Sequence, residues 1–161
     1  MKNSKVGLAH LAAENKDIEM LKLLVEFKIN LETTDADGMT ALYYSIEQRD
    51  TEVTKYLIDQ KVNLDHRDLQ NRSSIYWAAS CGEIPNLKLL LDAGCDPNIK
   101  SKLGRTALSK SCWNGFVDVV ACLLATGKID INSSDNHGRT ALHNAVWGSA
   151  GGRLGEKCGV S

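Results

Sequence analysis

Apolar residues recur along this chain at the spacing of short amphipathic helices, and the helices form a regular series. Leu, Ile or Val returns every three or four residues in four segments: MLKLLVEFKIN, VTKYLIDQKVN, NLKLLLDAGCD and VVACLLATGKID. The residues just before these segments lie 33 positions apart: Glu19, Glu52, Pro85 and Asp118. A fixed period of this length is the signature of a stacked repeat protein, so the pattern predicts four helices that pack side by side.

A second series lies upstream of each of these helices. It reads DADGMTALYYSI, DLQNRSSIYWAA, SKLGRTALSKSC and DNHGRTALHNAV. Three of its starts are 33 apart and the last is 34 further, the extra residue falling in the ATGKIDIN loop. Each copy has a turn residue, then a Thr or Ser suited to cap a helix, then a short helix rich in small residues. The predicted caps are Thr40, Ser73, Thr106 and Thr140.

Local signals support these boundaries. Pro85 stands at the start of its helix, where its missing N–H is tolerated. Gly94 and Gly127 follow their helices, where a left-handed residue is needed. Lys28 and Lys61 occupy the same position in the first two units, and we expect slight backbone strain there.

The D-x-x-G-x-T-A-L-x-x-A frame and the G-x-D-x-N ending closely resemble the ankyrin repeat. The resemblance implies an all-α repeat solenoid of stacked helix–turn–helix units joined by β-hairpin-like loops, with about 4.5 repeats. The repeats are approximately 2–34, 35–67, 68–100, 101–134 and a partial unit 135–148. The family's Thr-Pro-Leu-His signature lacks its proline in every unit, and its His stands only at His10 and His143.

The two ends differ from the inner units. The first unit lacks a good hairpin, and we expect it to act as an N-terminal cap. The last unit supplies a hairpin and a helix through Val146, followed by a Gly-rich loop or tail over 149–161. Because an unfinished repeat leaves its neighbour partly uncovered, we expect the natural protein to continue beyond Ser161 into a further helix or domain.

Composition excludes several classes of protein. The 161 residues carry a net charge of −1, which gives no general drive toward nucleic acid or membrane. Residues 1–68 have a net charge of −4 and residues 69–161 of +3. No signal peptide and no apolar run of about 20 residues is present. Five cysteines without a CxxC pair indicate free thiols and a cytoplasmic or nuclear location.

A search for catalytic chemistry finds none. The resemblance implies that His10 and His143 bond the backbone of the adjoining turn. His66 and His137 fall in loops, with no cysteine or carboxylate at a recurrent ligand spacing. The Gly-rich tail has Glu156 where a P-loop needs lysine, and no strand precedes it. We therefore predict a protein that is not an enzyme and has no cofactor and no metal site.

The resemblance places partner binding on the concave side, at the hairpin tips and the first helices. Arg72, Arg105 and Arg139 share one position in successive repeats and should form a ladder; Trp113 and Trp147 share another. Trp and Arg are enriched at binding hot spots. The predicted partner-binding residues are Met39, Leu69, Arg72, Lys102, Leu103, Arg105, Trp113, Asn114, His137, Arg139 and Trp147.

Two alternatives stay open at this surface. The arginines could pair only with Asp68 or Asp135, and Trp147 could pack under the tail. Trp77 lies nearer the start of its helix, where large residues wedge between repeats, so we expect it in the core.

The leading function is a monomeric protein–protein interaction scaffold for another protein or a peptide with acidic and apolar side chains. An alternative is a targeting or substrate-recruitment module of a larger multidomain enzyme whose catalytic part lies beyond Ser161. Nucleic-acid binding is disfavoured, because a net charge of +3 over 93 residues is weak for the several phosphate contacts it requires.

Overall fold

A computed structural model describes residues 6–150 of the chain, and the side chains of residues 6–148. Within this range the backbone forms nine α-helices and no strand, apart from one isolated antiparallel bridge between Arg67 and Ser73. The helices are α1 (Leu8–Glu14), α2 (Ile18–Glu26), α3 (Ala41–Glu47), α4 (Thr51–Asp59), α5 (Ser74–Ser80), α6 (Ile84–Asp92), α7 (Ala107–Asn114), α8 (Val117–Ala125) and α9 (Ala141–Ala150).

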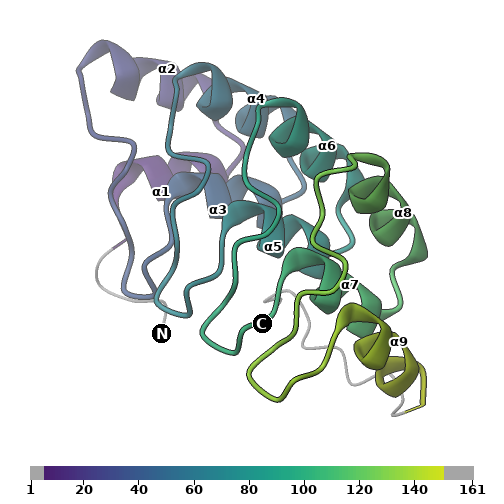
Figure 1. The fold of residues 1–161 in the computed structure, drawn as a ribbon. Helices are drawn as coiled ribbons and strands as arrows, with labels where there is room; N and C mark the ends of the chain where they lie inside the picture. The colour runs from purple at the N-terminus through teal and green to yellow at the C-terminus, as the bar shows by residue number, and fades with distance from the viewer. Residues whose placement is uncertain (1–5, 151–161) are drawn as a thin grey trace.

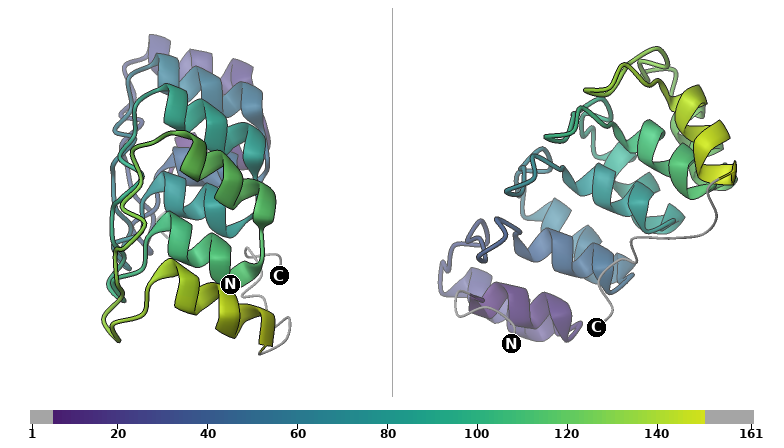
Figure 2. Two further views of the ribbon diagram at one scale, coloured as in Figure 1. Left: turned by 45° about the vertical axis from the view of Figure 1, so that its right-hand side comes forward. Right: turned by 90° about the horizontal axis from the view of Figure 1, so that it is seen from below.

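The helices stack in two layers (Figure 1). Helices α1, α3, α5, α7 and α9 form an inner layer, α2, α4, α6 and α8 form an outer layer, and the long loops gather along one edge (Figure 2). Four helix pairs followed by the single helix α9 confirm the all-α repeat solenoid with about 4.5 repeats. One boundary differs: α9 continues through Ala150 rather than ending at Val146, and the tail beyond it lies outside the described residues.

The predicted capping residues stand at the starts of the inner helices. The Ser73 hydroxyl accepts a hydrogen bond from the Tyr76 N–H, and the Thr106 hydroxyl accepts one from the Ser109 N–H. Thr40 is the N-cap of α3, but its side chain makes no cap bond. Outer helices α2 and α4 begin instead at aspartates, Asp17 and Asp50, which accept from the third helical N–H.

The left-handed positions after the outer helices are confirmed. Gly94 and Gly127 have φ of 87° and 65°, and Lys28 and Lys61 take up the same conformation with φ of 55° and 61°. A non-glycine residue in this region costs of order 1 kcal/mol, so the two lysines carry the backbone strain that the sequence predicts.

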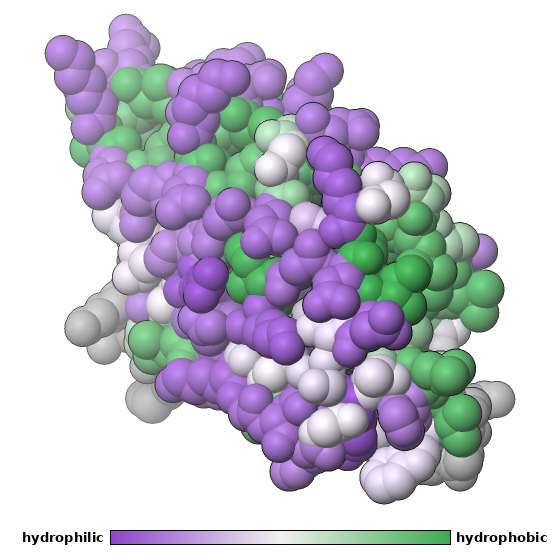
Figure 3. Space-filling model, viewed as in Figure 1, coloured by the Kyte–Doolittle hydropathy of each residue, from purple (hydrophilic) through white to green (hydrophobic). Residues whose placement is uncertain are grey.

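Both ends of the stack expose apolar side chains. In the first repeat Leu8 is 59% and Phe27 70% exposed, so apolar side chains interrupt its polar surface. In the last described repeat, Leu142 is 75% exposed, although its equivalents in the inner repeats are buried. Figure 3 shows hydrophobic surface over α8 at the right-hand edge of the molecule. Val117, the first residue of this helix, is 75% exposed.

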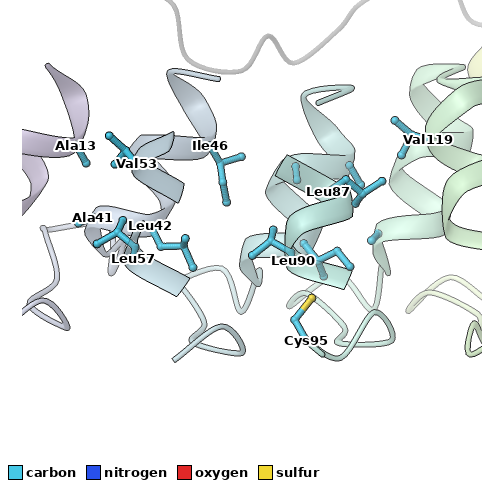
Figure 4. Close-up of a cluster of buried hydrophobic side chains, with 14 of the residues drawn as sticks. Ala13, Ala41, Leu42, Ile46, Val53, Leu57, Leu87, Leu90, Cys95 and Val119 are labelled. Carbon is cyan, nitrogen blue, oxygen red and sulfur yellow. The ribbon is translucent and has the colours of Figure 1, made fainter. Parts of the chain in front are cut away.

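The core follows the 33-residue period. Leu24, Leu57, Leu90 and Leu123 occupy one position of the outer helices and are all buried. Small residues on the inner helices let consecutive repeats approach closely, and their apolar side chains meet in one continuous core (Figure 4). No helix within residues 6–150 is long and apolar enough to cross a membrane.

The loop after each outer helix carries polar side chains whose hydrogen bonds repeat from unit to unit. The side chains of Asn30, Asn63, Asp96 and Asp130 each accept from the backbone N–H two residues later. Two positions further on, the side chains of Glu32, Asp65 and Asn98 accept from the next repeat's backbone at 2.6, 2.9 and 2.8 Å. The G-x-D-x-N ending therefore both turns the chain and sets the register between repeats.

The histidines of the described residues have structural partners or lie in loops. In His10, Nδ1 accepts from the Gly7 N–H at 3.0 Å and Nε2 donates to the Met39 carbonyl oxygen of the next repeat at 2.9 Å. His143 contacts the backbone N–H and the hydroxyl of Thr140. The ring of His66 donates to the Gly38 carbonyl oxygen at 2.8 Å. No cluster of three or more potential metal ligands occurs among the described side chains.

Tyr43 performs the cross-repeat role of His10 one repeat later. Its hydroxyl lies 2.6 Å from the His66 carbonyl oxygen and 2.8 Å from that of Arg72, which is the residue equivalent to Met39. Burial raises the pKa of this hydroxyl, so it keeps its donor proton.

We expect Tyr43→Phe to lower the free energy of unfolding by about 1–2 kcal/mol, because two partly buried carbonyl groups lose their donor. Urea denaturation measures this change. Tyr56→Phe is the control, since Tyr56 packs partly buried against the core and its hydroxyl makes no hydrogen bond among the described residues. Equal stability of the two variants would contradict this role of Tyr43.

The prediction of free thiols is confirmed for Cys95, Cys112 and Cys122 and is wrong for Cys81, which is disulfide-bonded. Burial, reinforced by Asp65 and Asp96, raises the pKa of Cys95 to about 12. A thiol alkylates through its thiolate, so we expect Cys95 to react with iodoacetamide at pH 7.5 far more slowly in the native protein than in urea. Mass spectrometry of the labelled peptides gives both rates, and equal rates would contradict the expectation.

Candidate interaction surface

The hairpin tips of successive repeats are hydrogen-bonded into one ridge. The backbone N–H groups of Leu69, Lys102 and Asn136 donate to carbonyl oxygens one repeat earlier, at 2.9, 2.8 and 3.1 Å. These bonds repeat with the period of the sequence and join the tips of four repeats. Side chains on the ridge therefore have fixed spacing, which lowers the entropic cost of binding a partner.

An aspartate at the base of the hairpin holds each turn in shape. The Oδ1 atom of Asp68 accepts the backbone N–H groups of Gln70 and Arg72, at 2.8 and 2.9 Å. Asp135 does the same for His137 and Arg139, at 2.9 and 3.0 Å. This explains the aspartate of the D-x-x-G motif.

Arg72, Arg105 and Arg139 share one position of the repeat, and we call them the ladder arginines. Two of the three are paired with these aspartates. The Nε atom of Arg72 donates to Asp68 Oδ2 at 2.7 Å, and that of Arg139 donates to Asp135 Oδ2 at 3.0 Å. Their side chains are only 28% and 20% exposed. The alternative left open by the sequence, internal pairing, therefore holds for Arg72 and Arg139.

Each ladder arginine also stacks on a tryptophan. The guanidinium carbon lies 4.6 Å from the ring centre in Arg72–Trp77, 5.5 Å in Arg105–Trp113 and 5.7 Å in Arg139–Trp147. Such cation–π contacts orient the planar groups relative to one another. The structure thus joins two of the predicted arginines to the predicted Trp113 and Trp147, and the third to Trp77, which the sequence assigned to the core. We call these three units the Arg–Trp stacks.

Trp77 needs a partial correction. It packs against the core, as expected, but it is only partly buried and forms the first Arg–Trp stack. Its indole Nε1 donates to Asp68 Oδ2 at 3.2 Å. Trp77 lies three positions earlier in the repeat than Trp113, one helical turn along the same face, which is why the arginine can reach either position.

The remaining predicted residues fall into two groups. Leu69 and Leu103 are 58% and 54% exposed at the tips, and Trp147 is 57% exposed. Lys102 and His137 are exposed and Met39 is half-buried. Asn114 is the exception, because its amide donates to the Ser80 carbonyl oxygen at 3.0 Å and ties α7 to the preceding repeat.

Asp135 makes the free energy of unfolding depend on pH. Burial alone would raise its pKa, but the N–H groups of Arg139 and His137 and the Arg139 guanidinium outweigh burial and hold the pKa below its usual value. Because the pKa of this carboxyl is lower in the folded state, its ionised form stabilises the fold at pH values above its ordinary pKa of about 3.9. This stabilisation is lost as the pH falls through the pKa of the folded state.

We therefore expect the stability difference between the native protein and an Asp135→Asn variant to be largest at neutral pH and to shrink below about pH 4. Urea denaturation at several pH values measures it. A difference that grows toward low pH would contradict the assignment. Asn132→Asp, at an exposed position, controls for a generic effect of charge.

These features define a helical repeat solenoid with a hydrogen-bonded hairpin ridge. The family model described as ankyrin repeats (3 copies) matches residues 9–101 and 86–152. The chain therefore belongs to the ankyrin repeat family. Ankyrin repeats are in general protein–protein interaction modules and are generally non-catalytic.

One of the relatives is itself named as an ankyrin repeat protein. The chain is 25% identical over 142 residues to the putative ankyrin repeat protein YahD of Escherichia coli (strain K12), covering 88% of this chain and 71% of the relative. It is 38% identical over 69 residues to the probable E3 ubiquitin-protein ligase XBOS33 of Oryza sativa subsp. japonica, covering 42% of the chain and 13% of the relative. It is 43% identical over 61 residues to the nuclear factor NF-kappa-B p105 subunit of Gallus gallus, covering 37% of the chain and 6% of the relative.

Sequence reasoning found the arginines and tryptophans but missed how they are joined. The Asp68–Arg72 and Asp135–Arg139 pairs, four residues apart across a turn, were left open as an alternative by the sequence, whereas the stacking of each arginine on a tryptophan was not predicted. The absence of that aspartate from one repeat, where Ser101 stands, was also visible in the sequence. The stacking of Arg72 on Trp77 carried no such signal, because Trp77 is out of register with the other tryptophans.

Proposed function

We propose that this protein is an interaction scaffold that binds another protein through the hairpin face, meaning the hairpin tips together with the Arg–Trp stacks. The observation that carries the proposal is the presence of a stack in three successive repeats. Arginine and tryptophan contribute a large share of the energy at protein interfaces, and here both are held in place before binding.

The neighbouring tips add apolar contact area. Leu69 and Leu103 are more than half exposed on the same ridge, and Trp147 is exposed in the last stack. A partner segment lying along the ridge would meet apolar, aromatic and basic side chains in turn. Because the repeats fix the spacing, such a partner would be recognised by its own spacing of acidic and apolar residues.

The double variant Arg105→Glu, Trp113→Ala tests the hairpin face. Affinity crosslinking from cells, followed by mass spectrometry, should recover partners with the native protein and lose them with the double variant. The control makes the same two types of change on the outer layer, Lys88→Glu with Phe27→Ala, both at exposed positions. If the double variant recovers the same partners as the native protein, the hairpin face is the wrong surface.

A second proposal is that the repeats recruit substrates to a larger multidomain enzyme whose catalytic part lies beyond Ser161. The rice relative, named a probable E3 ubiquitin-protein ligase, supports it, since the match covers only 13% of that protein. Determining the downstream reading frame decides this alternative. A stop codon directly after Ser161 would eliminate it.

A further inference from the structure

One repeat lacks the aspartate that neutralises its ladder arginine. Position 101, which is equivalent to Asp35, Asp68 and Asp135, holds a serine. The Ser101 hydroxyl accepts the Arg105 backbone N–H at 3.3 Å, so it keeps the turn in shape but supplies no negative charge. Arg105 is consequently the one ladder arginine without a carboxylate in its own hairpin.

The nearest carboxylate does not replace the missing one. Asp135 Oδ2 lies 3.9 Å from Arg105 Nε, whereas Arg139 holds the same carboxylate at 3.0 Å. The other oxygen of Asp135 is occupied by two backbone N–H groups. Among the described residues Arg105 Nε has no hydrogen-bond partner, although it is buried. One carboxylate therefore faces two guanidinium groups.

The surroundings of Arg105 are those of a binding position. Its side chain is 18% exposed and stacks on Trp113, which is partly exposed. Lys102 and Leu103 stand exposed on the hairpin tip of the same repeat. A partly desolvated cation with incomplete pairing gains more from an incoming anion than a solvated one does.

We propose that Arg105 is the anchor for a carboxylate of the partner protein, which supplies the negative charge that Ser101 leaves out. This inference rests on the proposed function of the hairpin face. Arg105, Arg139 and Asp135 together carry a single excess positive charge, beside exposed apolar side chains. This combination fits a Glu or Asp flanked by apolar residues better than a nucleic acid, which requires several phosphate contacts.

Returning the aspartate to the repeat tests the anchor directly. Ser101→Asp should pair Arg105 internally, as Asp68 pairs Arg72, and remove it from binding. The probe is a fluorescent peptide of alternating Glu and Leu, compared with the same peptide carrying Gln for Glu. Fluorescence anisotropy at low salt measures both affinities, and thermal unfolding reports whether each variant is folded.

We expect the native protein to bind the Glu peptide at least about tenfold more tightly than the Gln peptide. Ser101→Asp should remove this preference while keeping or raising the unfolding midpoint. Gln60→Glu adds the same charge at the end of α4 in the outer layer and should leave the preference intact. Arg105→Gln gives an independent loss of the preference should Ser101→Asp fail to fold.

Two results would overturn the anchor. One is equal binding of the two peptides by the native protein, and the other is an unchanged preference in folded Ser101→Asp or Arg105→Gln. Either result leaves the scaffold function standing if the Arg105→Glu, Trp113→Ala variant still loses its crosslinked partners. If that variant keeps its partners, the proposed function itself is wrong.

Discussion

Replacing Gly104 with alanine should destabilise the protein by roughly 3 kcal/mol, whereas the same change at Gly138 should cost about 1 kcal/mol. The two glycines occupy the same hairpin position and both have φ of 74°. An alanine Cβ at Gly104 would lie 2.5 Å from Asn136 Oδ1 and 2.8 Å from Asn136 N, while at Gly138 it would have no neighbour within 4 Å. The difference between the variants therefore measures how closely two hairpins approach.

Urea denaturation of both variants against the native protein gives the two values. Gly94→Ala is a further control, since Gly94 has φ of 87° and open space around it. If Gly104→Ala and Gly138→Ala cost the same, the hairpins do not pack as closely as described.

Replacing Asn86 with valine should stabilise the protein by about 1–3 kcal/mol. Asn86 lies on α6 and is completely buried, and neither its Nδ2 nor its Oδ1 has a hydrogen-bond partner among the described residues. The equivalent residues in the neighbouring repeats are Val53 and Val119, both buried. Valine at position 86 would remove two unsatisfied polar atoms and fit an environment that holds valine on either side.

The reciprocal change makes a matched control. Val119→Asn should lower stability by an amount similar to the gain from Asn86→Val, because it places an amide in an equivalent apolar environment. A loss of stability in Asn86→Val would show that the Asn86 amide has a stabilising role in this fold.

The architecture could be predicted from the sequence because the stack repeats one local pattern. Each helix, cap and turn recurs every 33 or 34 residues, so a weak signal in one repeat is confirmed by the next. Lys28 and Lys61 are an example. Their left-handed backbone conformation could be predicted only because they align with Gly94 and Gly127 in the repeat. Contacts between repeats recur in the same register. The side chains of Glu32, Asp65 and Asn98, for example, each accept a hydrogen bond from the backbone of the next repeat.

The site was predicted less completely, because its chemistry lies in departures from the repeat. Tyr43 stands at the position of the family's histidine, but only the structure shows that its hydroxyl contacts the Arg72 carbonyl oxygen, which is equivalent to the Met39 carbonyl oxygen that His10 contacts. The pairing of Arg72 and Arg139 depends on how the hairpin folds back on its aspartate. Trp77 belongs to a stack although it stands at a different position from the other tryptophans.

The central claim is that partners bind the hairpin face. A photoreactive amino acid at Leu103, exposed on a hairpin tip, and another at Lys88, exposed on the outer helix α6, test it most directly. Illumination in cells and mass spectrometry should yield partner adducts from position 103 and few or none from position 88. Adducts from position 88 with none from position 103 would contradict the claim.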